Sequence, residues 1–448
     1  PGDLPLDGLA HPIRPLVAET SRLALLLLEL LTQLVREIEL EGNEVSARLR
    51  GETMHLVITS SPGFDEEMDA EEVPERLPEA RITDLAAGTS QTEPLFGCEA
   101  ISYPERFSGL GLLTVLTFDL SQGLDPTDVD PVMTDGTTVY ASDSSLYVAT
   151  ERMEEPDGRV SSSTIVAPDV VPVSPAPASE TAIHRFDTSD AEMTSYASSG
   201  VVEGRILNEW SLSEHDGYLR VATTTGDAWV TGGSGESESG ISVLGEDGGS
   251  LTEVGRVDGL GEGEEIYGVR FIGDTGYVIT FKQTDPLYTV DLSEPADPET
   301  TGELKIPGYS AYLHPVGEGR LLGIGQGGTM SGTLTGAQAS LFDVADPTGP
   351  ERLDTLDLTE DGAYGSAAAE WDHHAFTFSP ELGVAVVPVE SYGAAGSSDA
   401  TVMRVDPDGS LARLASVDAG RRLDRAGIVG DRLVTVGAGE VGSRPLPG

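Results

Sequence analysis

The sequence predicts an all-β fold, a single propeller of repeated four-stranded blades. Residues 265–306 carry four short strand patterns separated by turns, and the pattern then restarts, over the roughly 45–50 residues of a propeller blade. A strand that follows a Gly or Asp turn recurs seven times along the chain. The segments VDLSEPADPE and FDVADPTGPE repeat their Asp, both Pro and Glu at one offset of 52 residues. These three observations indicate tandem blades.

The blade at 265–306 shows how each strand follows from the sequence. Apolar and polar residues alternate in its first strand, and Gly-Asp and Asp-Pro pairs mark the next two turns. A Pro-rich segment then leads to a short, edge-like fourth strand. The four predicted strands cover residues 266–271, 277–281, 287–292 and 304–306.

The turn-and-strand marker sets the number of blades at seven, with six or eight as alternatives. Its copies begin at residues 51, 135, 216, 273, 317, 381 and 430. The seventh copy supplies two strands, and an open sheet would leave unpaired edges. We therefore expect N-terminal strands to close the ring by pairing with the C-terminal strands.

The closing strands are expected within residues 23–41. Residues 34–40 alternate in polarity and predict an outer strand. Residues 23–28 are the apolar run left to be its neighbour, so we predict a buried strand there, beside the strand at 430–437. High helix propensity in the same stretch leaves a short helix as the alternative.

The repeat resumes in phase after each interruption, so we expect a single domain. Two long inserts, at about 60–110 and 151–180, interrupt it. The second is rich in Ser, Pro and Ala, which is typical of an exposed, mobile loop. The expected parts are a loose N-terminal segment (1–22), the propeller (23–437) and a C-terminal tail (438–448).

The chain is strongly acidic. It has 26 basic and 76 acidic residues, for a net charge of −50, and only two of the 26 are lysines, Lys282 and Lys305. A Lys-poor acidic surface suits molar salt, where the Debye length is about 3 Å. We therefore expect a halophilic archaeal protein, with an acidic secreted protein of an ordinary host as the alternative. The charge excludes nucleic acid and anionic lipid as partners, because no basic patch exists.

The chain carries few signals of a compartment. Cys98 is the single cysteine, so no intrachain disulfide can form. The apolar run at 23–31 contains Glu29 and is too short to span a bilayer. The first residue is Pro, so we expect a processed or truncated chain without its signal or anchor.

Several segments resemble the secreted β-propeller-domain family of archaea and bacteria, which is distantly akin to WD40 propellers. They are DGYLRVATT, the stretch from Glu265 to Pro315, LFDVADPTGP and DHHAF. The resemblance is strong over 200–390 and fainter over 34–200, and the chain departs from the family pattern at 20–33 and after 437. It implies a cell-surface or secreted propeller, and it carries over no catalytic motif.

No nucleophile–base signature is present, and a toroid with long rim loops is suited to recognition. We therefore expect a monomeric, non-enzymatic extracellular propeller that binds or scaffolds a protein or cell-surface partner. The alternative is a metal-assisted hydrolase that uses His314, His374, Asp372 and Glu265 in the central channel.

The first strand of each blade is expected to line the channel. These strands would cover residues 43–49, 215–221, 265–271, 309–315 and 371–378. Arg48, Arg270 and His314 each precede a turn glycine by three residues, which predicts equivalent levels in the ring. The candidate channel residues are Arg48, Glu265, Arg270, Tyr309, His314, Asp372 and His374.

His314, Asp372 and His374 are weak candidates for metal ligands, since imidazole and carboxylate suit Zn or Mn. On a strand only one of His373 and His374 can face a given site, and a histidine bonded to the backbone is the favoured interpretation. We predict no cofactor, although calcium or another cation is an alternative. The loop carboxylates that would bind such a cation are those of Asp125, Asp128, Asp130 and Asp143. Their spacing is not that of an EF-hand, so we favour the interpretation that they are solvated surface acids.

The net charge predicts that folding depends on high salt. At low ionic strength the carboxylates repel one another over about 10–30 Å, whereas molar salt screens that repulsion. Lowering the KCl or NaCl concentration should therefore abolish the near-UV circular dichroism of the folded state. An unchanged signal at about 50 mM salt would overturn the halophilic origin.

Overall fold

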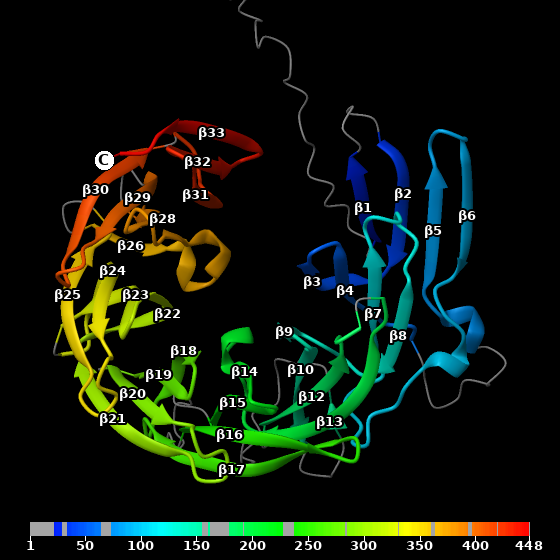
Figure 1. Ribbon diagram of the computed structural model, residues 1–448, viewed down its shortest axis with the longest axis horizontal. Coiled ribbons are helices and arrows are strands. Elements are labelled where there is room, and N and C mark those ends of the chain that lie inside the picture. Colours follow the sequence, from blue (N-terminus) through cyan, green and yellow to red (C-terminus); the bar gives the residue numbers. More distant parts are fainter. Residues whose placement is uncertain are drawn as a thin grey trace, which may run out of the picture.

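Short antiparallel sheets that follow one another around an arc make up the fold (Figure 1). In the described residues every regular element is a β-strand or a single 3-10 turn, which confirms the all-β prediction. The computed structural model describes residues 22–28, 34–63, 73–154, 160–161, 179–190, 192–226, 237–282, 285–329, 331–359, 363–392, 397–418 and 420–447.

The blade predicted at 265–306 is confirmed strand by strand. Its strands pair in chain order, with the first at the inner side of the arc and the last at the rim (Figure 1). Gly273, at φ +53°, takes the left-handed conformation that the first turn requires. The strands are β18 (Glu265–Ile272), β19 (Thr275–Phe281), β20 (Asp285–Asp291) and β21 (Glu299–Ile306).

The central strand of this blade is buried on both faces. Val278 packs against the preceding blade, whereas Tyr277 and Ile279 pack against the following blade. Successive side chains of a strand point to opposite faces of the sheet, so one strand supplies two cores. Strand alternation therefore holds adjacent blades together as well as shaping each one.

The 52-residue repeat marks a contact between blades. At Gly255 an added Cβ would overlap the carbonyl oxygen of Pro295, and at Gly302 it would overlap that of Pro347. Each repeated Pro-rich turn therefore lies against the outer strand of the blade before it, where a glycine makes room. The Thr289 hydroxyl donates to the same carbonyl of Pro347.

Three more blades follow the same plan. A parallel bridge between Ser199 and Ser250 joins the outer strands of two of them, and β11 (Val160–Ser161) adds to β10. Their strands are β9 (Thr138–Ala141), β10 (Ser145–Glu154), β12 (Ser179–Asp187) and β13 (Ser195–Glu203); β14 (Leu212–His215), β15 (Tyr218–Thr225), β16 (Glu238–Asp247) and β17 (Ser250–Leu260); and β22 (Gly308–Gly317), β23 (Arg320–Gly328), β24 (Leu334–Asp343) and β25 (Glu351–Asp357).

Two predicted inner strands are wrong. Asp216 and Gly217, both at positive φ, turn the chain in the middle of 215–221, so β14 is the inner strand there. Within 371–378 the chain forms a 3-10 turn, since Asp372 accepts the backbone N–H of His374 at 3.1 Å. This blade comprises β26 (Tyr364–Ala367), η4 (Ala368–Glu370), η5 (His373–Ala375), β27 (Thr377–Ser379), β28 (Val384–Tyr392), β29 (Ser397–Val405) and β30 (Leu411–Asp418).

The first two blades are interleaved, which the sequence did not predict. The expected insert at 60–110 contains a hairpin that adds to β2 and completes the first sheet, so its description as a plain insert is wrong. Ile82 of the hairpin lies opposite Ile38. The strands are β1 (Arg22–Leu28), β2 (Leu34–Glu41), β5 (Glu79–Asp84) and β6 (Thr89–Pro94), then β3 (Asn43–Arg50), β4 (Thr53–Ser60), β7 (Leu112–Asp119) and β8 (Asp128–Met133), with turns η1 (Val73–Arg76) and η2 (Cys98–Ala100).

The two ends of the chain do not pair as predicted. Residues 22–28 form the predicted strand, β1, and it pairs with β2 (34–41) as expected. It does not pair with the 430–437 strand, because both edges of that strand are taken by its own neighbours. The predicted tail at 438–448 is also wrong, because Ala438 and Gly439 turn the chain into a further strand. The C-terminal sheet contains β31 (Arg425–Val429), β32 (Arg432–Gly437) and β33 (Glu440–Pro445).

The described strands thus form four four-stranded sheets, a nine-stranded sheet that joins two blades, a five-stranded sheet and a three-stranded unit. In Figure 1 the three-stranded unit and the β1–β2 hairpin lie at the two ends of the arc. Within the described residues no ladder joins these ends, so closure by pairing of N- and C-terminal strands is wrong for this part of the chain. The expected mobile loop at 151–180 lies mostly outside the described residues.

Replacing Ile38 with Ala should destabilise the whole fold, because this residue of β2 lies in the core shared by the first two blades. Ile38 is fully buried beside Leu56 and Phe118 of the second blade. A buried Ile-to-Ala change costs about 2–5 kcal/mol of the free energy of unfolding. Urea unfolding in high salt measures this loss.

The matched control is Leu49→Ala, because Leu49 is 65 % exposed on the neighbouring strand β3. This change should alter the free energy of unfolding by less than about 0.5 kcal/mol. Equal urea midpoints for the Ile38 and Leu49 variants would show that the N-terminal sheet is not part of the cooperative fold.

Candidate functional site

Three short 3-10 turns meet at the inner side of the arc and form a pocket of about 170 Å³ with strand β22. The turns are η3 (Glu209–Ser211), η4 and η5, which belong to two different blades. Side chains from all three turns line the pocket together with Tyr312 of β22. Prominent among them are Asn208, Trp210, Glu370, Trp371 and His373.

Trp210 is positioned by the cap of its turn. The side chain of Asn208 accepts the backbone N–H of Trp210 at 3.0 Å, and the hydroxyl of Ser211 accepts the N–H of Leu207. The indole then packs beside Tyr312, with 6.1 Å between the ring centroids. A turn before β14 thus supplies a pocket wall to a blade two positions further along the arc.

Arg270 of β18 lies against the indole of Trp210. Its guanidinium carbon is 4.0 Å from the ring centroid, which is a cation–π contact. Burial lowers the pKa of Arg270, but an arginine starts far above neutrality and keeps its charge. The inner face therefore holds a fixed cation on an aromatic plane.

His373 forms the opposite wall through an ion pair with η3. Its Nδ1 lies 2.9 Å from Oε1 of Glu209, and its ring meets Trp210 edge-on at 5.1 Å. Burial would raise the pKa of Glu209, but the hydrogen bond from His373 and smaller contributions hold it below its usual value. The pair ties η3 to η5 across the pocket.

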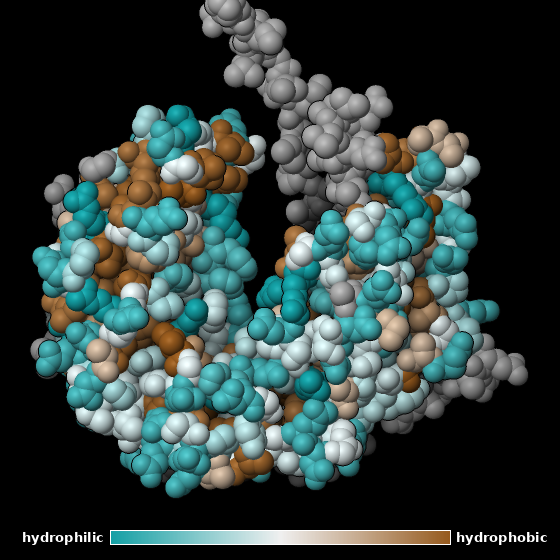
Figure 2. All heavy atoms as spheres, viewed as in Figure 1, coloured by the Kyte–Doolittle hydropathy of each residue, from teal (hydrophilic) through white to brown (hydrophobic). Residues whose placement is uncertain are grey.

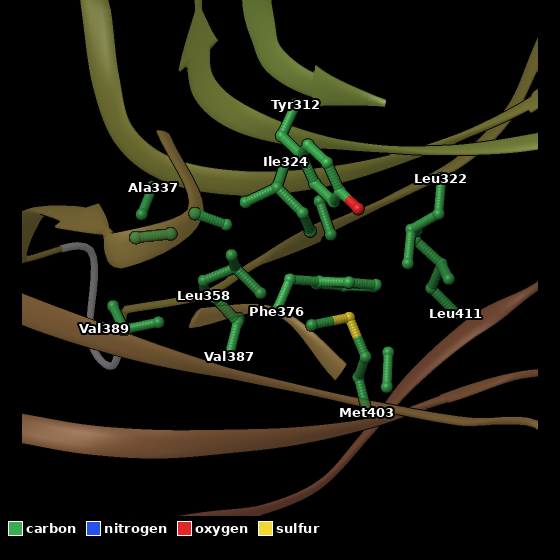
Figure 3. Packing of buried hydrophobic residues seen from close by; sticks show 14 of the residues in the cluster. Tyr312, Leu322, Ile324, Ala337, Leu358, Phe376, Val387, Val389, Met403 and Leu411 are labelled. Carbon is green, nitrogen blue, oxygen red and sulfur yellow. The ribbon is translucent and has the colours of Figure 1, made fainter. Parts of the chain in front are cut away.

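Tyr312 and His314 anchor the floor. The phenol of Tyr312 and Nδ1 of His314 are 3.0 Å apart, and Phe376 packs against both rings. Figure 3 shows Tyr312 and Phe376 within the core that also contains Val387 and Met403. Burial, with a smaller effect of Arg270, lowers the pKa of His314 to about 4, so this histidine is neutral at neutral pH.

The structure brings some of the predicted channel residues together and separates others. Arg270 and His314 belong to the cluster around Trp210. Arg48 donates to the carbonyl of Val139 at 3.2 Å. Glu265 is paired with Arg205 at 2.8 Å, away from this cluster.

Three further predicted residues lie at or near the pocket in supporting roles. Tyr309 packs on Tyr267, with 4.8 Å between centroids, and hydrogen-bonds Glu370. Asp372 pairs with Arg425 at 2.6 Å. His374 lies 3.2 Å from the same carboxyl group and is mostly exposed, and both it and its neighbour His373 line the pocket.

Two of the three predicted metal ligands lie together and the third does not join them. His374 contacts Asp372, whereas His314 contacts Tyr312. Across the described ranges, no group of three or more His, Cys, Asp or Glu is arranged to hold a metal ion.

Three of the four loop carboxylates considered for calcium are also engaged. Asp125 pairs with Arg36 at 2.6 Å, while Asp128 and Asp130 accept hydrogen bonds from Thr194. Burial raises the pKa of Asp130 to about 6, with Asp128 adding to the effect. The backbone carbonyl of Asp143 accepts a hydrogen bond from Arg50.

The sequence analysis misses Trp210 and Glu209 and, of the two adjacent histidines, selects His374 and leaves out His373. A usable signal exists for the first, since Asn208 is one of two asparagines in the chain and stands at the cap position before one of three tryptophans. No comparable signal marks His373, because its orientation depends on a turn that interrupts the expected strand.

Comparison with known proteins identifies related sequences. The family model described as a β-propeller domain matches residues 22–445. An uncharacterised protein of Methanocaldococcus jannaschii is 41 % identical over 194 residues, which are 43 % of this chain and 29 % of that protein. An uncharacterised protein of Archaeoglobus fulgidus is 42 % identical over 192 residues, or 43 % of this chain and 28 % of that protein. The match thus spans less than a third of these relatives' length.

Solved structures with a similar arrangement are more distant in sequence. The periplasmic gluconolactonase of Pseudomonas aeruginosa has a TM-score of 0.43 at 14 % identity, covering 72 % of this chain and 84 % of that one. A putative 6-phosphogluconolactonase from Bacteroides uniformis has a TM-score of 0.42 at 14 % identity, covering 75 % and 87 %. These likenesses are too distant to bear on activity.

Helices of membrane-spanning length and hydrophobicity are absent from the part of the chain that the structure describes.

Replacing His314 with Gln should weaken the dependence of stability on acid pH. The folded pKa is about 4, whereas an unfolded histidine titrates near pH 6.5. Below about pH 6.5 the unfolded chain binds a proton that the folded chain does not. Stability present above that pH is therefore lost as the pH falls towards 4, and the variant should lose less of it.

Urea unfolding in high salt at several pH values between about 4 and 7 measures this dependence. The comparison variant is His374→Gln, which removes a mostly exposed imidazole from the same region. Identical pH dependence in the wild type and in His314→Gln would show that His314 is not held neutral.

Proposed function

The chain belongs to the β-propeller domain family, and on this premise we propose that it is a non-enzymatic binding or scaffolding propeller. Its ligand enters the pocket formed by η3, η4, η5 and β22. The protein acts outside the cell or at the cell surface of a halophile. A protein or cell-surface component is the partner.

The exposed aromatic wall of the pocket carries this proposal. Trp371 is 58 % exposed and lines the pocket together with Trp210 and Tyr312. Large aromatic side chains contribute much of the binding energy at recognition sites, because they offer a wide apolar face at low entropic cost. An exposed tryptophan beside a concave polar site is better explained by a ligand than by folding.

The state of the pocket carboxylates favours binding over hydrolysis. Glu209 is paired with His373, and Asp372 with Arg425. Glu370 accepts hydrogen bonds from Gln326 at 2.8 Å and from the backbone of Ala367 at 2.7 Å. Burial raises the pKa of Glu370. These carboxylates hold the turns in place, whereas a general base needs a free carboxylate within reach of substrate.

The proposed habitat rests on charge. A net charge of −50 with two lysines favours molar salt, and Figure 2 shows hydrophilic residues spread over the visible face. Extracellular placement rests on the resemblance to secreted propellers. The hydrolase alternative would place a metal on His314, Asp372 or His374.

Replacing Trp371 with Ala should abolish ligand capture without unfolding the protein, because the side chain is exposed at the pocket. Immobilised protein would be exposed in high salt to peptide arrays, glycan arrays and solubilised haloarchaeal cell envelope. The wild type should retain a ligand, and the variant should retain at least about tenfold less.

The matched control is Tyr103→Ala, which removes an aromatic side chain that is 65 % exposed outside the pocket. It should bind as the wild type does. Two outcomes would refute the proposal: capture that survives Trp371→Ala, or metal-dependent hydrolysis by protein purified without chelator.

A further inference from the structure

Three N–H donors near the pocket lack acceptors. Nε1 of Trp210 and both Nε and Nη1 of Arg270 are buried without a hydrogen-bond partner in the described part of the chain. The two side chains are in contact, with the guanidinium carbon 4.0 Å from the indole centroid. Buried donors without acceptors are uncommon in folded proteins, and a charged donor is the costlier case.

Carboxylate groups are abundant in this chain, which has 76 acidic residues for 26 basic ones. Arg205 pairs with Glu265 at 2.8 Å, and Arg152 pairs with Glu180 at the same distance. Among the described residues, Arg270 and Arg220 each lie over an aromatic ring without a carboxylate partner. Arg220 donates to the carbonyl of Gly273 and the hydroxyl of Ser213, whereas Nε and Nη1 of Arg270 have no acceptor.

The acids closest to the pocket are already engaged. Glu209, Asp372 and Glu370 take their hydrogen bonds from His373, Arg425 and Gln326 respectively. At this site the carboxylate acceptors are already paired, whereas the N–H donors of Trp210 and Arg270 are not. A ligand group with oxygen atoms and a negative charge would satisfy these donors.

We propose that Arg270, held on the face of Trp210, binds a carboxylate group of the ligand that occupies the pocket. This inference rests on the proposed function, because the same ligand contacts Trp371. Arg270 does not line the pocket itself, but it is partly exposed and stacks on Trp210, which does. The proposed carboxylate therefore extends past the indole to the guanidinium.

A planar carboxylate fits this site better than a phosphate. One guanidinium presents two parallel N–H donors to two oxygens, which is the bidentate pairing of Arg with carboxylate. Phosphate sites usually add a second cation or the N-terminus of a helix. Arg48, a neighbouring cation of the inner strands, donates to the backbone carbonyl of Val139 and the hydroxyl of Ser46.

Acetate and acetamide are the probes that test this inference. They have the same shape, but acetamide is neutral. Both would be titrated at constant high ionic strength and followed by isothermal calorimetry and by the ¹⁵Nε resonance of Arg270. Acetate should bind saturably and shift that resonance, acetamide should not, and chloride should compete.

Arg270→Gln should weaken acetate binding at least about tenfold. Arg270→Lys keeps the charge but loses the two parallel N–H donors of the guanidinium, so it should weaken binding less. The control is Arg404→Gln, an exposed arginine of β29, which should bind as the wild type does. Near-UV circular dichroism verifies that each variant is folded. N-acetylalanine and glucuronate then distinguish a peptide carboxylate from a uronic acid. The probe that binds more tightly identifies the chemical class of the ligand.

Equal effects of acetate and acetamide, no acetate binding, or unchanged binding by Arg270→Gln would overturn the carboxylate site. Failure of this inference is distinguishable from failure of the proposed function. If acetate fails while ligand capture still depends on Trp371, only the carboxylate assignment is wrong. If acetate binds at Arg270 but ligand capture is unchanged by Trp371→Ala, only the proposed pocket function is wrong.

Discussion

The structure depends on strands that are buried on both faces. In β19, Val278 faces one neighbouring blade while Ile279 faces the other, and both side chains are fully buried. A blade within the arc is therefore stabilised by both of its neighbours, because its middle strands carry apolar side chains on either face. The same constraint explains the first sheet. The β5–β6 hairpin completes it by pairing with β2, and Ile38 of β2 packs into the core shared with the second blade.

Blade packing also creates the pocket. The inner strands converge, and the turns before β14 and β27 fill the space between them. Trp210 packs against a core shared by the blades of β22–β25 and β26–β30, which lie two and three positions further along the arc, so a turn of one blade becomes part of another's site. Three interblade contacts, the Glu209–His373 pair among them, then fix the geometry that the ligand meets.

The sequence predicted those strands whose positions depend on local alternation of polarity and on turn residues. The strands of the 265–306 blade follow from Gly273 and from alternating residues such as Val269 and Arg270. Long-range pairing was not predictable in this way, since residues 79–94 carry mostly polar side chains and only their pairing to β2 makes them a hairpin. His373 was not expected at the site because strand alternation places only one of two adjacent side chains there, whereas the turn capped by Asp372 lets both His373 and His374 line the pocket.

The central claim is that this inner pocket binds an acidic ligand through the paired Trp210 and Arg270 side chains. The most direct measurement is a crystal structure of protein purified without chelator and crystallised in high salt with acetate in place of chloride. The account predicts a planar oxyanion within hydrogen-bond distance of Arg270. A pocket that holds ordered water alone at Arg270, or a metal ion on His314, Asp372 or His374, would contradict it.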